Sequence, residues 1–243
     1  MKKKLTAIFL CVALLAIAIV GASLAYFTDT DKADNVFTTG KVDIALKEDF
    51  EQNSKLLPAT GSAQNGTLKN GVGKEISVTA EKGSEDTFVR VHIAIPSILD
   101  DGDPSFDAKK NVLHFNYDPS SIGEGKWDWS KDTGAPYEGD WNFYTTTIDG
   151  INYNVYVVTY GTALKAEETT ALPAMHQVYL DSKVTNGDIE KINETLGENW
   201  EIKVIAEGCQ SAGFSDAYAA LNASFGVPGT YTPAAWTTTT TGE

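Results

Sequence analysis

Three histidines are the side chains of this 243-residue sequence that a metal ion or an acid–base reaction would use first. His92, His114 and His176 lie far apart in the sequence, and none belongs to an H-E-x-x-H motif, which binds zinc through two histidines one helical turn apart. We interpret them as structural histidines with hydrogen-bond partners in the folded chain. Neither a G-x-S-x-G motif nor a Walker A loop is present, and no catalytic residue is predicted.

Two groups of aspartates resemble calcium-binding loops only superficially. Neither group fits the D-x-[DN]-x-[DN]-G pattern, because Ala33 takes the third ligand position of the first group and the second lacks the spacing. We interpret both groups as solvated acids and predict no metal site and no cofactor, with weak calcium binding between subunits left open. The groups are Asp29, Asp31 and Asp34, and Asp100, Asp101 and Asp103.

Aromatic residues gather in a glycine-rich region between residues 122 and 144. One interpretation is a ligand platform, on which a surface adhesin would stack a glycan or bind a host protein. The favoured interpretation is that these aromatics pair across strands and close one end of a β-sandwich. The platform candidates are Trp127, Trp129 and Trp141.

Period-two alternation of apolar and polar residues dominates the chain beyond residue 40. Together with frequent Gly, Asn and Asp between the runs, it predicts a mostly β chain: a jelly-roll-like antiparallel β-sandwich with a few short inserted helices. Gly197 and Gly226 are expected to end two such helices. The predicted strands are 42–46, 76–80, 89–95, 151–160, 178–184 and 200–206, and the predicted helices are 188–196 and 216–225.

The N-terminus has the pattern of a signal peptide. Lys2–Lys4 precede an apolar run over Ala7–Val20, and Ser23 and Ala25 give the small-x-small pattern that signal peptidases cut. Cleavage after Ala25 would make Tyr26 the first residue of the mature chain. The alternative is a retained anchor, since the apolar run is almost long enough to span a bilayer.

Cleavage sets the predicted domain organisation and the charge. The mature chain would carry 16 Lys and Arg against 33 Asp and Glu, a net charge of −17, which excludes nucleic acid and disfavours anionic lipid. We therefore expect a secreted protein of the cell surface or extracellular matrix that meets the membrane only before cleavage. Cys209 is expected to be a buried free thiol. The predicted parts are a signal peptide 1–25, an N-terminal segment 26–40, a single β-sandwich domain 41–232 and a flexible Thr-rich tail 233–243.

The stretch GASLAYFTDTDKADNVFTTGKVDIAL, residues 21–46, resembles the N-terminus of the TasA/camelysin family of exported proteins from Gram-positive bacteria. This resemblance implies processing by a SipW-type signal peptidase, a jelly-roll domain and assembly into extracellular fibres of the biofilm matrix. The matching elements are Ala25, Tyr26–Asp29, Phe37–Gly40 and Val42–Ile44, and weaker likeness extends to Phe88–Val91 and Gly213–Gly226.

The same resemblance implies how fibres would form. The released N-terminal segment would add as a donated strand to the next subunit, where it satisfies the unpaired backbone groups of a sheet edge. Head-to-tail donation does not close on itself and so gives a filament. The expected anchors are Tyr26, Phe27, Val36 and Phe37.

Two alternatives to donation remain open at this point. Residues 26–40 could instead be the first, self-paired strand of their own domain. The camelysin name also implies a surface metalloprotease, for which the sequence offers no recognisable zinc ligand set. The expected partners are further copies of the chain, a minor fibre or anchor protein, and the signal peptidase.

Overall fold

The described strands form where apolar and polar residues alternate most regularly. The computed structural model describes residues 40–51, 54–59, 68–102, 111–130, 141–198 and 200–237. The elements in these ranges are β1 (Ile44–Phe50), β2 (Val72–Ala80), β3 (Thr87–Pro96), β4 (Leu113–Asn116), η1 (Pro119–Ser121), β5 (Trp127–Asp128), β6 (Phe143–Ile148), β7 (Ile151–Tyr160), β8 (Gln177–Leu180), α2 (Asn186–Leu196), β9 (Lys203–Gln210), α3 (Ala217–Phe225) and α4 (Ala234–Thr237).

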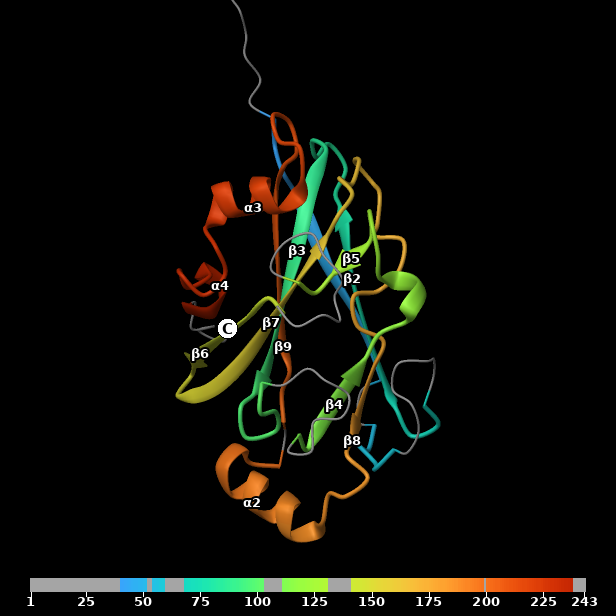
Figure 1. The fold of residues 1–243 in the computed structure, drawn as a ribbon, viewed down its shortest axis with the longest axis vertical. Helices are drawn as coiled ribbons and strands as arrows, with labels where there is room; N and C mark the ends of the chain where they lie inside the picture. Colours follow the sequence, from blue (N-terminus) through green and yellow to red (C-terminus); the bar gives the residue numbers. More distant parts are fainter. Residues whose placement is uncertain are drawn as a thin grey trace, which may run out of the picture. The chain divides into compact units, whose positions relative to one another are not determined.

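Two antiparallel sheets make up the fold, which confirms the predicted β-sandwich (Figure 1). One sheet has the strand order β1-β2-β8-β4, and the other has the order β5-β7-β3-β9 with β6 paired to β7. A two-residue turn joins β6 to β7: Asp149 and Gly150 have φ values of 52° and 81°, which is the left-handed geometry of a type I′ hairpin. That turn fixes the register in which Ile148 faces Ile151.

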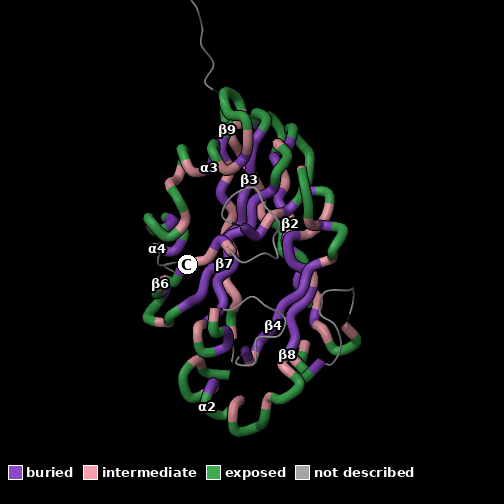
Figure 2. Tube along the Cα trace, in the orientation of Figure 1, coloured by how far each residue is buried: buried purple, intermediate pink, exposed green. Residues whose placement is uncertain are grey.

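The main core lies between the sheets, and the central strands are buried on both faces (Figure 2). Along β3, Val89, Val91 and Ile93 point into this core. The alternating residues Phe88 and Ala94 belong to two smaller apolar clusters on the other face of the same sheet. These clusters are completed by α3 and by Trp236 of α4, so the C-terminal segment shields a second apolar face from water.

Both predicted helices are present, with small changes at their starts. Helix α2 begins at Asn186, and its cap is a reciprocal pair in which the side chains of Thr185 and Asp188 bond each other's backbone N–H. Asp188 is therefore the partner in a capping box and not the N-cap itself. In the part of the chain that the structure describes, no helix is both long and apolar enough to cross a membrane.

The C-terminal tail begins later than the sequence suggested. We expected residues 233–243 to be flexible, but Ala234–Thr237 form α4, and the Trp236 side chain is only 9% exposed. The indole Nε1 of Trp236 donates to the Tyr144 hydroxyl at 3.0 Å. Burying the indole ring is favourable because its N–H keeps a hydrogen-bond partner. The first residues of the tail are therefore packed on the domain. Residues 238–243 lie outside the described residues.

Candidate functional site

The tryptophans of the predicted ligand platform belong to the core. Trp127 and Trp129 are 0% and 1% exposed, and the Trp127 indole donates to the Leu172 carbonyl at 2.6 Å. Trp129 stacks on Phe115 with ring centroids 5.1 Å apart, and the half-buried Trp141 meets Trp129 edge-on at 5.6 Å. Because their ring faces are covered by protein, Trp127 and Trp129 have no surface on which to stack a sugar. This arrangement matches the interpretation that the aromatics close the sandwich.

Asp100 also differs from the expectation of a solvated acid. Its side chain is 2% exposed, and Oδ2 accepts hydrogen bonds from the Tyr156 hydroxyl at 2.6 Å and from Asn154 at 3.2 Å. Burial raises the pKa of the Asp100 carboxyl, against these hydrogen bonds, which lower it. Asp100 thus ties the end of β3 to β7. Asp29, Asp31, Asp34 and Asp103 lie outside the described residues.

All three histidines of the chain are described, and each bonds a different acid. His92 Nε2 lies 3.0 Å from Glu207, His114 Nε2 lies 2.8 Å from Asp181, and His176 Nδ1 lies 3.1 Å from Glu75. Among the described residues no three His, Cys, Asp or Glu side chains are grouped as metal ligands.

A buried ionic cluster joins β3, β9 and the C-terminal segment. Arg90, which is 2% exposed, donates from Nε to Glu207 at 2.7 Å and from Nη1 to Asn222 at 3.0 Å. Its Nη2 donates to the Gly226 carbonyl at 3.1 Å and to the Tyr231 hydroxyl at 2.6 Å. The arginine therefore fastens the end of α3 and the loop beyond it to the sheet. Two segments that carried the weaker family likeness, Phe88–Val91 and Gly213–Gly226, meet in this cluster.

Glu207 makes the stability of this cluster dependent on pH. Burial alone would raise the pKa of its carboxyl, but hydrogen bonds from His92 and Tyr231 and the charge of Arg90 lower it to about 2. A carboxyl whose pKa is lower in the folded chain stabilises the fold above its unfolded pKa. That stabilisation is lost as the pH falls toward the folded value.

We expect the contribution of Glu207 to fall by about 2 kcal/mol between pH 6 and pH 3, since each unit of pKa difference corresponds to about 1.4 kcal/mol. This contribution is measured by urea unfolding of the wild type and of Glu207→Gln at both pH values. The glutamine amide does not titrate, so the variant lacks the pH-dependent part. The free-energy gap between the two proteins should narrow at pH 3. A gap that stays constant would contradict the assignment.

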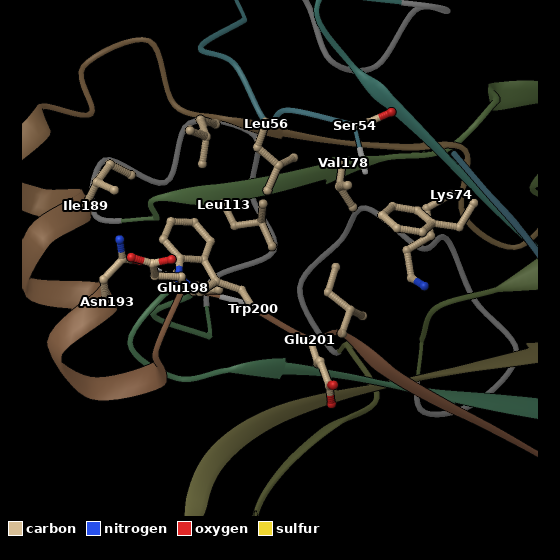
Figure 3. Close-up of a pocket in the computed structure, with 14 residues that line it drawn as sticks. Ser54, Leu56, Lys74, Leu113, Val178, Ile189, Asn193, Glu198, Trp200 and Glu201 are labelled. Carbon is tan, nitrogen blue, oxygen red and sulfur yellow. Dashed lines mark hydrogen bonds between the residues drawn. The ribbon is translucent and has the colours of Figure 1, made fainter. Parts of the chain in front are cut away.

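A groove with both apolar and polar walls opens between the two sheets at the end of β1 (Figure 3). Its volume is about 630 Å³, within the roughly 300–1,000 Å³ range of ligand sites. Trp200 forms part of one wall and is held by a hydrogen bond of 2.9 Å from its Nε1 to Asn193 of α2. The lining residues are Phe50, Ser54, Leu56, Lys74, Leu99, Leu113, Val178, Leu180, Ile189, Asn193, Glu198, Trp200, Glu201 and Ile202.

The groove lies where two edge strands part. β1 is the edge of one sheet and β9 the edge of the other. Near the start of β1 they touch, since a Cβ atom at Gly208 would come within 3.0 Å of the Ile44 side chain. At the other end of β1, Phe50 lines the groove together with Ile202, which precedes β9. The seam between the sheets is thus closed at one end and open at the other.

This groove could not be predicted from the sequence. Its walls come from β1, β2, β4, β8, α2 and the turns beside them, so no local motif marks it. Half-buried apolar residues border the seam, but their incomplete burial is a property of the fold, so the sequence contains no signal for the groove. The predicted cleavage residues Ser23, Ala25 and Tyr26 and the predicted anchors lie outside the described residues. Those anchors are Tyr26, Phe27, Val36 and Phe37.

Comparison with protein-family models gives a match at the N-terminus. Residues 1–74 match the model of a family described as camelysin metallo-endopeptidase. This range includes the stretch on which the resemblance to the TasA/camelysin family was based, together with β1 and the start of β2. No curated protein matches the chain.

Proposed function

We propose that the protein is a secreted structural subunit of extracellular matrix fibres, on the basis of the match of residues 1–74 to the camelysin family model and of the resemblance of residues 21–46 to the TasA/camelysin family. The family match supports a surface or matrix protein, and fibre assembly is the proposed step beyond it. Subunits would join when the segment 26–40 of one copy adds as a strand to the next. Signal cleavage after Ala25 would release that segment.

The groove beside β1 is the observation that carries this proposal. β1 pairs only with β2, and β9 only with β3, among the described residues, so each has one edge without a strand partner. An unpaired edge offers N–H and C=O groups to an added strand. Half-buried apolar side chains border the seam between these edges, where an incoming strand would cover them. They are Ile44, Leu46, Ile202, Val204 and Ala206.

The proposed donor segment suits such a seam. Its anchors are aromatic or β-branched residues, namely Tyr26, Phe27, Val36 and Phe37, and apolar groups gain by leaving water. The groove offers aliphatic and aromatic walls that could cover them, including Leu56, Phe50 and Trp200. Backbone pairing would supply affinity, and alternate side chains would supply specificity.

The matched family is described as a metallo-endopeptidase, and we propose that this chain does not act as one. Zinc peptidases hold the metal with histidines and a carboxylate and keep one position open. Each histidine here instead bonds a different acid, and His92 is fully buried. The donor set therefore does not fit a catalytic zinc ion. The adhesin alternative loses its main residues, because Trp127 and Trp129 are covered.

Electron microscopy of the purified mature protein tests the proposal. The wild type should form filaments, and deletion of Tyr26–Asn35 should leave folded particles that do not polymerise. Circular dichroism of the deletion variant checks that the domain keeps its β structure. Filaments that persist in the deletion variant, or a wild type that stays monomeric at every salt concentration and pH, would contradict the proposal.

A matched pair of substitutions tests the groove itself. Leu56 is half-buried and lines the groove, whereas its neighbour Leu57 is 47% exposed and does not. Leu56→Asp should reduce filament formation at least tenfold, because the added strand would bury a carboxylate without a partner, which is costly. Leu57→Asp adds the same charge one residue away and should assemble like the wild type. Equal effects of the two changes would remove the groove from the account.

A further inference from the structure

A chain of hydrogen bonds runs from Trp236 into the sheet. Trp236 Nε1 lies 3.0 Å from the Tyr144 hydroxyl, which lies 3.0 Å from His92 Nδ1, and His92 Nε2 lies 3.0 Å from Glu207. His92 is 0% exposed, and Tyr144, Glu207 and Trp236 are each below 10%. The four residues come from β3, β6, β9 and α4, so the chain links the C-terminal segment to both edges of one sheet.

The chemistry of the two ends fixes the direction of the outer bonds, and a neutral His92 fixes that of the middle one. An indole N–H only donates, so the Tyr144 oxygen accepts from Trp236. The Glu207 carboxylate only accepts, so His92 Nε2 carries a proton and donates to it. The Tyr144 O–H then has His92 Nδ1 as its acceptor, which requires a neutral imidazole. Burial raises the pKa of Tyr144 to about 12, so its proton stays in place.

A second proton on His92 would disrupt this order. Nδ1 would become a donor, so the Tyr144 hydroxyl would face two donors, His92 Nδ1 and Trp236 Nε1. The Tyr144 proton would lose the acceptor that it has among the described residues. The charge would also become unbalanced. The groups facing His92 are Glu207 of β9, Arg90 of β3, Tyr144 of β6 and, through Glu207, Tyr231 of the C-terminal loop. Arg90 already neutralises Glu207, so imidazolium would leave a net positive charge in a buried cluster.

The C-terminal segment also fits closely where it crosses β6. Gly229 has a φ of 84°, and a Cβ atom there would come within 2.9 Å of the Tyr144 Cβ. With the Arg90 bonds to Gly226 and Tyr231, this contact makes the segment a fitted cover. Beneath it lie apolar residues of the outer sheet face, among them Val155 and Val157.

We propose that Val227–Thr237 form a pH-sensitive latch over the outer face of the β7-β3-β9 sheet, held shut while His92 is neutral and loosened when His92 takes up a proton. Opening would expose His92, Trp236 and the apolar residues of that face to water. This inference is independent of fibre assembly, since it concerns a different face of the domain from the groove.

The expected direction follows from proton linkage. Burial lowers the pKa of His92 in the closed state, against the neighbouring Glu207, which raises it. In an open state the imidazole would have a pKa near its ordinary value of about 6.5. Opening therefore takes up a proton and becomes about tenfold more favourable for each pH unit below about 6.5, until the closed-state pKa is reached.

Amide hydrogen exchange of the mature protein between pH 7.5 and pH 5 tests the latch, after correction for the intrinsic pH dependence of exchange. Protection of residues 231–237 should fall about tenfold per pH unit below about 6.5, while that of β7 stays constant. His92→Gln keeps one acceptor and one donor without titrating, so its exchange should not depend on pH. His114→Gln, in a separate ion pair, should behave like the wild type.

Two results would overturn the latch: protection of 231–237 that does not change with pH in the wild type, or a pH dependence that survives in His92→Gln. If His92→Gln does not fold, nitrogen NMR of histidine in the wild type decides. A neutral imidazole protonated at Nε2 at pH 7.5, with the Trp236 indole signal changing as His92 titrates, supports the latch. Protonation at Nδ1 alone, or at both nitrogens at pH 7.5, overturns it.

Discussion

Arg90→Ala is expected to lower the free energy of unfolding by about 3–5 kcal/mol, because it leaves the buried Glu207 carboxylate without its cation. Arg90 is 2% exposed and makes hydrogen bonds to Glu207, Asn222, Gly226 and Tyr231. Its removal deprives all four of a donor. Urea unfolding monitored by circular dichroism at pH 7 measures the loss.

An exposed ion pair supplies the control. The ammonium group of Lys41 lies 2.5 Å from Asp43, and its side chain is 72% exposed. Solvated pairs of this kind contribute about 0–1 kcal/mol, so Lys41→Ala should change the stability little. Replacing both Arg90 and Glu207 by apolar residues should recover part of the loss, since no charge is then left buried. A loss below about 1 kcal/mol in Arg90→Ala would show that water reaches the cluster.

Trp127→Ala is expected to destabilise the fold by about 3–5 kcal/mol, the cost of removing a large buried aromatic side chain. Trp127 is 0% exposed and meets Tyr160 edge-on, with ring centroids 5.0 Å apart. Its removal also leaves the Leu172 carbonyl without the indole donor. A ligand platform would give the opposite result, since an exposed aromatic can be truncated with little effect on stability.

Chemical unfolding again provides the measurement, and Val227→Ala is its control. Val227 is 54% exposed, and truncating an exposed side chain usually changes stability by less than about 0.5 kcal/mol. If both variants unfold at the same denaturant concentration as the wild type, Trp127 is not part of the core. Glycan binding lost by a fully stable Trp127→Ala would restore the platform interpretation.

Local pattern was enough to predict the long strands and both helices. The run over 151–160 coincides with β7, and Pro96 ends β3 where a proline removes a ladder donor. Gly197 and Gly226 follow the two helices as expected. The short strands β4, β5 and β6 were not predicted, because runs this short seldom show a clear alternation, whereas the equally short β8 overlaps the longer predicted strand 178–184.

Contacts between distant segments were the part that could not be predicted. Arg90 meets Asn222 across 132 positions, and Asp100 meets Tyr156 across 56. A single sequence contains nothing that pairs such residues, so Asp100 was misjudged as solvated and the role of Arg90 was missed. The burial of Cys209 was predicted correctly, since its strand-like neighbours already suggested an apolar setting.

The two proposals assign different tasks to two separate surfaces of one domain. The seam beside β1 and the groove would receive a strand from another copy, while the C-terminal segment covers the opposite face of the β9 sheet. Neither task needs a catalytic residue or a metal ion. Arg90 and Glu207 are buried under the C-terminal segment, whereas the groove combines apolar walls with the charged residues Lys74, Glu198 and Glu201.

Disulfide trapping between two differently labelled copies tests the donated strand most directly. After signal cleavage Cys209 is the remaining cysteine, and it is 6% exposed, so it interferes little with added thiols. One copy carries Leu56→Cys, and the other carries a cysteine in place of Tyr26, Phe27, Val36 or Phe37. The account predicts that mixing gives cross-linked heterodimers for at least one donor position, and that Leu57→Cys in place of Leu56→Cys gives none. Filaments that form without any such cross-link would contradict the account. So would a cross-link that forms at high dilution within single chains carrying both cysteines, because the segment would then pair with its own domain.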